Sequence, residues 1–541
     1  NWKFTSKILL RNLSKVLDFF KTPPKSRRKE LFSLLTASGV FIVKPVVTPH
    51  ETYQGFVIEQ LRQHFTGGLL VLVNKDWPLI LKLWITDLSG ITTLLQDGYS
   101  TRGPAPRDPA SMLRSLLLFL LTKPEIGITA WVDELYRAPL YAILSGFVPG
   151  DVPGVGTFYD FYARLWAASE KNFKPRKQRR KRKPKKGKKG EKAPTTTPGR
   201  IKRLVNWMMR HLDKRKDLPM DRLFHFFQSQ FLAVSARFGL LGDMGTLGVA
   251  GDGTPLVTAA YPRSKPTCDC HAQGLAKCNH PRIYSQPDCN SGWDSARERY
   301  FNGYHLYMLT AATSPYDLPL YPRLHPASRH DAVSFVVSSV EFSQRFTLGM
   351  IDRILLDAAH DAGPIYDLLL HQNIEPFIDL NVRGTKNLET DGDIQISPDG
   401  IPVCSCKKKM KHDGFDHSQK RHKWRCPMMK GRTTNTCPKP CSTAKYGRTF
   451  HTCSKDNPRL FPNTPRGSEK WKLIYKRRTT SERTNKREKI DYKLESGRHR
   501  STEMWYIRIY GIMMCQHMDA WYAHLKEDLK GLKQLIFPQA A

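Results

Sequence analysis

The sequence predicts an α/β core that is preceded by a helical amino-terminal region and interrupted by an insertion. Three observations predict this fold class. Apolar residues recur at helical spacing before residue 170, short apolar strands alternate with helices after residue 246, and a Lys-, Cys- and Gly-rich stretch without helical periodicity follows the last of these strands. With 541 residues, of which 40% are hydrophobic, the chain can bury a large core, which excludes global disorder.

We expect five segments along the chain, with no internal repeat. They are a helical amino-terminal domain (1–170), a basic disordered linker (171–203), a helical lead-in with the first half of the core (204–381), a Cys- and Lys-rich insertion (382–467), and the second half of the core with the carboxy-terminal helices (468–541).

Helix signals are clearest in the amino-terminal domain. Asp108 and Pro109 form an N-cap and N1 pair ahead of the apolar helix Met112–Leu121. The helical pattern continues through Trp131–Leu144 and Thr157–Trp166, which a Pro/Gly turn separates.

Positive charge dominates the chain, with 86 Lys and Arg against 49 Asp and Glu, a formal net charge of +37. The block Lys174–Lys192 holds 13 basic residues and one acidic residue, so we expect a disordered arm there, with a nuclear-targeting or RNA-binding tail as the alternative. The excess charge indicates a polyanionic partner, nucleic acid before an anionic membrane surface, and we assign DNA binding to the amino-terminal domain as well. The most apolar stretches are too short or too interrupted to span a membrane.

The core is expected to begin after two amphipathic helices, Arg200–Arg210 and Asp221–Phe238. One helix is expected near Gly363–Leu370. Short apolar runs predict four strands, namely Leu247–Gly251, Tyr304–Ala312, Arg353–Leu356 and Pro376–Leu380.

Two aspartates follow predicted strands, a position at which sites assemble in α/β sheets. Asp252 comes after Leu247–Gly251 and before a Gly turn, and Asp357 comes after Arg353–Leu356. Asp352 lies at the other end of the second strand, so Asp357 is the better candidate. Either aspartate taken alone is more often a turn or cap residue.

A third carboxylate lies in the segment Trp471–Ser496, which contains no Gly or Pro and is predicted to be one long helix. At about 100° per residue, Tyr475, Arg478, Glu482 and Lys489 fall within an arc of roughly 60°. One helix face therefore presents a carboxylate, a phenol and two cations to a single neighbour. A solvated, salt-bridged face is the alternative, but it requires neither the tyrosine nor a lone carboxylate among so many cations.

The spacing Y-(2)-R-(3)-E-(6)-K resembles the motif of the YREK group of bacterial insertion-sequence DDE transposases, and all four positions match. The segments GDGTPL and LLDAAHDAG are similar to those that carry the first and second Asp of that family. Ala359 and His360 stand where Gly and Tyr are common, a departure that leaves Asp357 in register. The resemblance covers roughly residues 246–530.

This resemblance implies a ribonuclease-H-like core with Asp252, Asp357 and Glu482 as a catalytic triad. Converging carboxylates repel one another unless a divalent cation bridges them, and hard oxygen ligands suit Mg²⁺ or Mn²⁺. Two such ions about 3.5–4 Å apart support in-line displacement at phosphorus, first by water and then by the freed 3′-hydroxyl. The resemblance further implies that backbone phosphates of DNA are bound by Tyr475, Arg478 and Lys489.

The partners that the resemblance implies are double-stranded DNA, as terminal inverted repeats and as target, and a second copy of the chain in a homodimer on DNA. No G-x-x-x-x-G-K-[ST] loop is present, so no nucleotide cofactor is expected. Nothing at the amino end resembles a secretory signal, and a cytoplasmic, nucleoid-associated protein is expected. A silent or domesticated DNA-binding protein and a ribonuclease-H-like nuclease that cuts without joining are the alternatives.

Eleven cysteines, an odd number at modest density, indicate reduced thiols, some of which could bind metal. In the insertion we expect that structural zinc could be held by Cys404, Cys426, Cys437 and Cys441, with Cys406 and Cys453 nearby. A second and less favoured candidate consists of Cys268, Cys270, Cys278 and His280, and the spacing of neither group fits a standard finger. Loose reduced thiols are the alternative for both groups.

Three histidines fall near the predicted core, at His305, His330 and His360. We expect them to be structural or to orient ligands rather than to bind metal themselves.

Overall fold

A computed structural model of the chain describes residues 44–529, apart from gaps at 69–70, 102, 167, 174–198, 261–264, 276–277, 279, 281, 284, 383–387, 390–393, 431–433, 438–440 and 528. The basic block Lys174–Lys192 and the arm predicted for it lie outside the described residues. The chain divides into two compact units, one of Asn1–Leu165 with Trp521–Ala541 and the other of Trp166–Ala520.

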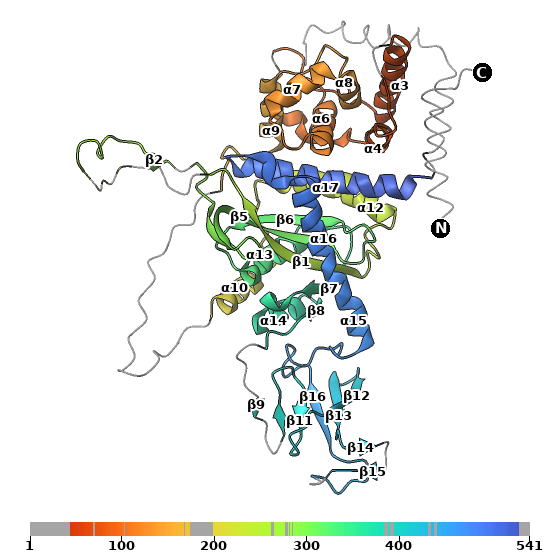
Figure 1. Cartoon of the computed structure of the whole chain (residues 1–541), viewed down its shortest axis with the longest axis vertical. Helices are drawn as coiled ribbons and strands as arrows, with labels where there is room; N and C mark the ends of the chain where they lie inside the picture. Colours follow the sequence, from red (N-terminus) through yellow and green to blue (C-terminus); the bar gives the residue numbers. More distant parts are fainter. Residues whose placement is uncertain are drawn as a thin grey trace. The chain divides into compact units, whose positions relative to one another are not determined.

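The first unit is helical, as predicted (Figure 1). Asp108 caps α6 as expected, because its carboxylate accepts hydrogen bonds from the N–H groups of Ala110 and Ser111. The predicted helical stretch Trp131–Leu144 divides at Pro139, which starts a new helix. The helices are α3 (His50–Thr66), α4 (Trp77–Ile85), α5 (Gly90–Leu95), η1 (Gln96–Gly98), α6 (Pro109–Thr122), α7 (Ile128–Arg137), α8 (Pro139–Ser145) and α9 (Val155–Leu165).

In the part of the chain that the structure describes, no single helix is long and apolar enough to span a membrane. The helices Trp77–Ile85 and Gly90–Gly98 are long and apolar enough only when they are taken together, and the chain bends by 60° between them.

The second unit is built on a mixed six-stranded sheet, which confirms the α/β class (Figure 1). β1 runs antiparallel to β5 and parallel to β7, and β7 runs parallel to β8. The strand order is β4 (Asn290–Asp294), β5 (Arg299–Ala311), β1 (Leu247–Val257), β7 (Ile351–Leu356) and β8 (Glu375–Ile378), with β6 (Pro319–Pro326) also paired to β5.

All four predicted strands are present, but β4, β6 and the helix α13 (Asp331–Ser343) were not predicted. β6 contains Pro319, Pro322 and Pro326, and a run so rich in proline indicates a loop when only the sequence is considered. The prolines are tolerated in β6 because this strand pairs with β5 on one side and with no strand on the other, among the described residues.

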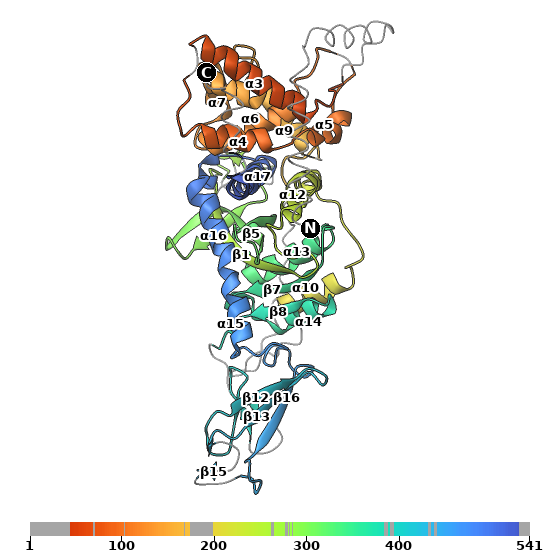
Figure 2. The same ribbon diagram turned by 90° about the vertical axis from the view of Figure 1, so that its right-hand side faces the viewer.

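Helices cover both faces of this sheet (Figure 2). Ala250 of β1 and Leu355 of β7 pack in one cluster with Trp471 of α15 (Glu469–Tyr475). On the opposite face α13 contacts β1, β5 and β6, and α14 (Gly363–His371) connects β7 to β8. Because successive side chains of a strand alternate between faces, residues of β1 with the parity of Ala250 point toward α15.

The segment predicted as one helix over Trp471–Ser496 is instead four consecutive helical pieces. They are α15, the 3₁₀ turn η4 (Lys476–Arg478), α16 (Thr479–Lys486) and the π-helical turn η5 (Arg487–Asp491). The helix ends before Lys493, whose φ of 46° is left-handed. Since a π-helical turn holds more residues than an α-helical turn, the arc calculated for Lys489 does not apply.

The lead-in helices match their predictions in α10 (Arg200–Met209) and in the continuous run of α11 (Asp221–Phe227), η2 (Gln228–Leu232) and α12 (Ala233–Arg237). After the short turn η6 (Leu494–Gly497), the chain enters α17 (Thr502–Leu525). Arg345, which follows α13, joins this part of the core to the lead-in through a buried ion pair in which its Nε lies 2.6 Å from Oδ1 of Asp221.

The insertion is made of short strands in its described part. Trp424 and Cys404 are buried in one apolar cluster, and Arg459 ties the insertion to the core through an ion pair with Asp361, in which Nη2 and Oδ2 are 2.6 Å apart. The strands are β9 (Leu388–Glu389), β10 (Gln395–Ile396), β11 (Pro402–Val403), β12 (Lys411–Asp416), β13 (Arg421–Arg425), β14 (Met429–Lys430), β15 (Thr434–Asn435) and β16 (Thr449–Cys453).

Glu488 is buried between η5 and α17 and is poorly satisfied there. Its Oε1 accepts a long hydrogen bond of 3.5 Å from Nε2 of Gln516, and its Oε2 has no hydrogen-bond partner among the described residues. Burial raises the pKa of Glu488 to about 8.

Because the folded-state pKa of Glu488 lies above its ordinary value of 4.5, the folded chain holds a proton that the unfolded chain releases between those two pH values. Its contribution to stability is therefore complete below pH 4.5 and is lost as the pH rises through about 8. We expect Glu488→Gln to flatten this dependence, leaving the variant more stable than wild type at pH 8–9 by roughly 1.4 kcal/mol per pH unit of the window. Urea unfolding midpoints at pH 5–9 measure the effect.

The matched control is Glu469→Gln, because Glu469 is largely exposed on α15 and its replacement should leave the pH dependence unchanged. Equal pH dependence in wild type and Glu488→Gln would contradict the buried, proton-binding role of Glu488.

Candidate active site

Two aspartates lie side by side where β7 ends. Ala250 of β1 pairs with Leu355 of β7, so Asp252 and Asp357, two residues further on, continue the same parallel register. Both aspartates share the parity of Ala250 and Leu355 and therefore belong to the face that α15 covers. The prediction that Asp252 follows its strand is wrong. Asp252 lies within β1, which continues to Val257 beside β5.

The third carboxylate reaches this face from α16. Nδ2 of Asn485 donates a hydrogen bond of 3.0 Å to Oδ2 of Asp252, which fixes α16 against β1. Glu482 lies three residues earlier on the same helix, half-exposed, and its Oε1 is 2.7 Å from Nη2 of Arg478. Its charge acts on the pKa of Asp252. The three residues predicted as a triad are thus brought together at one end of the sheet.

Electrostatic repulsion is concentrated on Asp252. Burial first, and then the negative charges of Asp357, Asp331 and Glu482, together raise the pKa of Asp252 to about 6 against an opposing effect of His360. A carboxyl group in this position is partly protonated near pH 6 unless a positive charge is added. The site therefore favours a cation.

His360 orients Asp357 through a short hydrogen-bond chain. In the tautomer protonated at Nδ1, His360 donates to Oδ1 of Asp357 over 2.6 Å, and its Nε2 accepts from the hydroxyl of Tyr307 over 2.8 Å. Burial raises the pKa of Asp357, but the bond from His360 outweighs it, so the pKa is lowered overall. Asp357 and Asp252 therefore have opposite pKa shifts although they are neighbours.

The structure adds a fourth carboxylate, Asp331, that the sequence did not single out. Asp331 opens α13, and its Oδ1 lies 2.8 Å from Nε2 of His305. A Cβ on Gly253 would collide with both side chains, so glycine is required at that point of β1. An aspartate in the first turn of a helix is ordinary, which is why its position in the sequence carried no signal.

Asn485 was not predicted either, although the sequence contained a signal for it. It lies three residues after Glu482, a spacing that places both side chains on one side of a helix. His330 is structural, since its side chain caps α13 by accepting from the N–H of Ala332.

Two of the three predicted phosphate-binding residues lie at the site. The hydroxyl of Tyr475 donates to the carbonyl of Leu356, the residue before Asp357, over 3.2 Å. Burial raises the pKa of Tyr475 to about 12, so the phenol remains a donor at neutral pH. Arg478 is the partner of Glu482 described above.

Lys489, the third, is engaged elsewhere. Its Nζ lies 3.6 Å from Oε1 of Glu495, and its side chain is 18% exposed. Burial lowers its pKa, and the charges that act on it come from Glu495, Arg297 and Asp294 rather than from the triad. Lys489 lies within the π-helical turn η5, which explains the departure from the predicted helix face.

A separate group of ligands converges in the loop between β1 and β4. Within the described residues, one group of three or more Cys, His or carboxylate donors lies within 4.8 Å of one another, and it consists of Cys268, Cys270, Cys278 and His280. We call it the Cys3His cluster, and it could hold a metal such as zinc.

The insertion was the favoured place for zinc from the sequence, but its predicted ligands Cys404, Cys426, Cys437 and Cys441, all described, do not form such a group. Cys404 and Cys426 are buried, and Sγ of Cys404 lies 2.7 Å from Sγ of Cys406. All eleven cysteines are free of disulfides.

Comparison with known proteins gives no independent assignment. No protein-family model matches the chain, and no curated protein matches it significantly in sequence.

Because burial and like charges raise the pKa of Asp252 from its ordinary value of 3.8 to about 6, the proton it binds in the folded state stabilises the chain fully below pH 3.8, and this stability is lost as the pH rises through about 6. We expect Asp252→Asn to raise the free energy of unfolding of the metal-free protein at pH 7.5 by about 1 kcal/mol or more, since the amide can still accept from Asn485. Chemical unfolding in the presence of a chelator measures this.

A matched control is Asp317→Asn. It breaks an ion pair in which Oδ1 of Asp317 and Nη2 of Arg483 are 2.6 Å apart, so it should lower stability. Arg483 lies on α16, as Asn485 does. A loss of stability in Asp252→Asn as large as in Asp317→Asn would refute the repulsion at Asp252.

Proposed function

We propose that the chain is a DDE transposase that cleaves DNA at the ends of its insertion sequence and transfers the freed 3′-hydroxyl into target DNA. The observation that carries the proposal is the gathering of Asp252, Asp357 and Glu482 at one end of the sheet in a chain of net charge +37. A protein that only bound a polyanion would weaken its affinity by collecting carboxylates in this way. Metal-dependent phosphoryl transfer, in contrast, requires carboxylates to bind the cations.

The fold supports the ribonuclease-H-like core that the YREK resemblance implies. β1 carries one aspartate, its parallel neighbour β7 delivers the second, and α16, packed on the same face, supplies the glutamate. The site sits beyond the carboxyl end of β7, at the edge where open α/β sheets bind their ligands.

The donor set fits a hard divalent cation, Mg²⁺ or Mn²⁺. Its ligands would be the carboxylates of Asp252, Asp357 and Glu482, which are oxygen donors of the kind such ions prefer. Burial and repulsion raise the pKa of Asp252 as long as nothing positive separates these groups. Bound there, the cation would lower the pKa of an attacking water and stabilise the leaving oxygen.

The remaining residues of the site hold these groups in place and receive DNA. Asn485 fixes Asp252, and His360 fixes Asp357. Arg478 would exchange Glu482 for a phosphate oxygen when that carboxylate turns to a cation, and the phenol of Tyr475 would donate to the same backbone. For Lys489, phosphate binding requires release from Glu495, which an approaching phosphate can drive by offering a stronger negative charge.

The proposal includes double-stranded DNA as partner, both as terminal inverted repeats and as target, a homodimer that holds two element ends, and a cytoplasmic, nucleoid-associated location. A ribonuclease-H-like nuclease that cuts without joining would use the same three carboxylates and is the second candidate. A silent DNA-binding protein is disfavoured because it gives no role to the triad.

We expect Glu482→Gln to lose at least about 100-fold in both DNA nicking and strand transfer, because it removes one charge of the cation-binding set. The assay uses duplexes that end in the inverted repeats flanking the coding sequence, with Mg²⁺ or Mn²⁺. Glu469→Gln is the matched control, since Glu469 lies on α15 in the same helical segment but is largely exposed and pairs with Lys472.

Equal activity of Glu482→Gln and wild type would reject the catalytic assignment. Nicking without joining by the wild-type protein would favour the nuclease, and specific binding to the ends without cleavage by any variant would favour the silent DNA-binding protein.

A further inference from the structure

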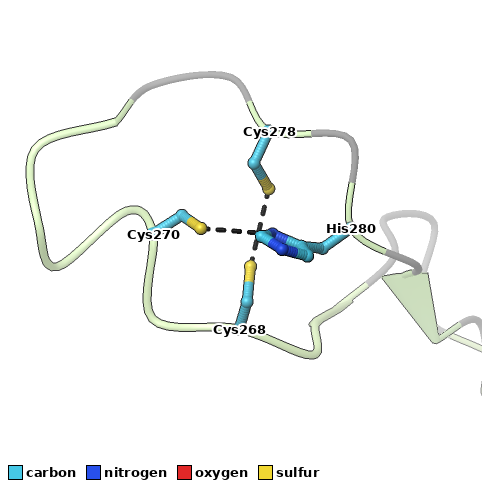
Figure 3. Close-up of side chains that lie close together, drawn as sticks. All are labelled: Cys268, Cys270, Cys278 and His280. Atoms are coloured by element: carbon cyan, nitrogen blue, oxygen red, sulfur yellow. Dashed lines mark hydrogen bonds between the residues drawn. The ribbon is translucent and has the colours of Figure 1, made fainter.

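Four side chains of the Cys3His cluster point toward one another from a single loop (Figure 3). Sγ of Cys268 and Sγ of Cys278 are 3.5 Å apart, and Sγ of Cys270 is 3.2 Å from Nδ1 of His280. All four donor atoms lie within 4.8 Å of one another. The loop belongs to the hairpin formed by β2 (Lys265–Pro266) and β3 (Arg282–Ile283), which we call the β2–β3 hairpin.

These separations suit a tetrahedral zinc ion. With Zn–S bonds of about 2.3 Å and Zn–N bonds of about 2.0–2.1 Å, tetrahedral geometry separates two sulfurs by roughly 3.8 Å and a sulfur from a nitrogen by roughly 3.6 Å. The observed S–S and S–N distances fall about 0.3–0.4 Å short of these values, so a small outward movement of each side chain accommodates the ion. Three thiolates and one imidazole complete its coordination and leave no place for a substrate, which is the arrangement of a structural site.

The β2–β3 hairpin has little else to hold it together. Its two strands pair over two residues each, Lys265 with Ile283 and Pro266 with Arg282. No described residue between 267 and 280 is buried, and Leu275 is 56% exposed. A segment without an apolar core cannot offset the entropy of ordering its chain unless a cross-link or a metal replaces the core.

The base of the hairpin is fixed to the sheet, in contrast to its tip. Before the hairpin, the carbonyl of Ala260 accepts a hydrogen bond of 3.1 Å from Nδ2 of Asn302 on β5. After it, Oδ1 of Asp288 accepts from the hydroxyl of Tyr304 over 2.8 Å, and Oδ2 of Asp288 accepts from the hydroxyl of Thr502. Contacts with the core therefore hold the two ends of the segment, whereas its middle is held by the Cys3His cluster.

We propose that the Cys3His cluster binds one structural Zn²⁺ and that this ion folds the β2–β3 hairpin. Binding takes the three cysteines as thiolates and the histidine as the neutral imidazole, so protons leave the ligands as the ion enters and no redox step is involved. The site is independent of the proposed transposase activity, because it shares no residue with the carboxylates near the end of β7. The rival state is a disulfide between Cys268 and Cys278, which would exclude the ion.

The test is the zinc content of the full-length chain, purified under reducing conditions, supplied with Zn²⁺ and desalted. We expect about one zinc per chain in wild type and loss of that zinc in Cys270→Ser with Cys278→Ser. Cys453→Ser, which changes a partly exposed cysteine of the insertion, should keep it, and so should Cys404→Ser. Removal of the metal should also accelerate trypsin cleavage within the β2–β3 hairpin, whereas cleavage elsewhere in the chain should stay unchanged.

A further variant keeps the test decisive if the double serine variant does not fold. His280→Cys supplies a fourth thiolate, so it should retain zinc and, when loaded with Co²⁺, show stronger sulfur-to-metal charge-transfer absorption than wild type. Absence of zinc from reduced wild type would overturn the proposal. So would zinc that survives loss of Cys270 and Cys278 but disappears in Cys404→Ser, or a disulfide between Cys268 and Cys278 in the reduced, zinc-supplied protein.

Discussion

Repulsion between carboxylates at the carboxyl end of β7 is the constraint on which the rest of the site depends. Parallel pairing of β1 with β7 brings Asp252 and Asp357 together, and the packing of α16 adds Glu482. Such a cluster lowers stability on its own, so the surrounding contacts have to hold it in place. Asn485 binds Asp252 and His360 binds Asp357, and each leaves part of its carboxylate available.

The carboxylate cluster also bears on how the positive charge of the chain is interpreted. A net charge of +37 indicates a polyanion but does not distinguish binding from chemistry. Arg478 lies against Glu482, so a phosphate and a cation can replace two partners that already neutralise each other. The proposed zinc in the β2–β3 hairpin plays a different part, since sulfur ligands and closed coordination serve folding, while open oxygen ligands serve phosphoryl transfer.

Sequence patterns predicted the helical first unit and the core strands, because strand runs, caps and helix spacing are local signals. They also singled out three carboxylates that the fold places near one another, and the catalytic role of these residues stays a prediction. They missed β6, whose prolines are typical of loops, and the π-helical turn that moves Lys489 off the predicted face. Asp331 escaped because only the tertiary fold places the start of α13 beside β1. For the cysteines, the sequence favoured the insertion although neither group has a standard finger spacing, whereas three-dimensional proximity favours the Cys3His cluster.

The most direct measurement of the central claim replaces Mg²⁺ by Fe²⁺ in zinc-loaded protein and maps the backbone cuts made by hydroxyl radicals generated at the bound iron. If Asp252, Asp357 and Glu482 share one divalent-cation site, cuts occur near all three of these residues, distant in sequence, and excess Mg²⁺ suppresses all three together. Cuts that are absent from two of these positions, or that excess Mg²⁺ leaves unchanged, would contradict a shared site.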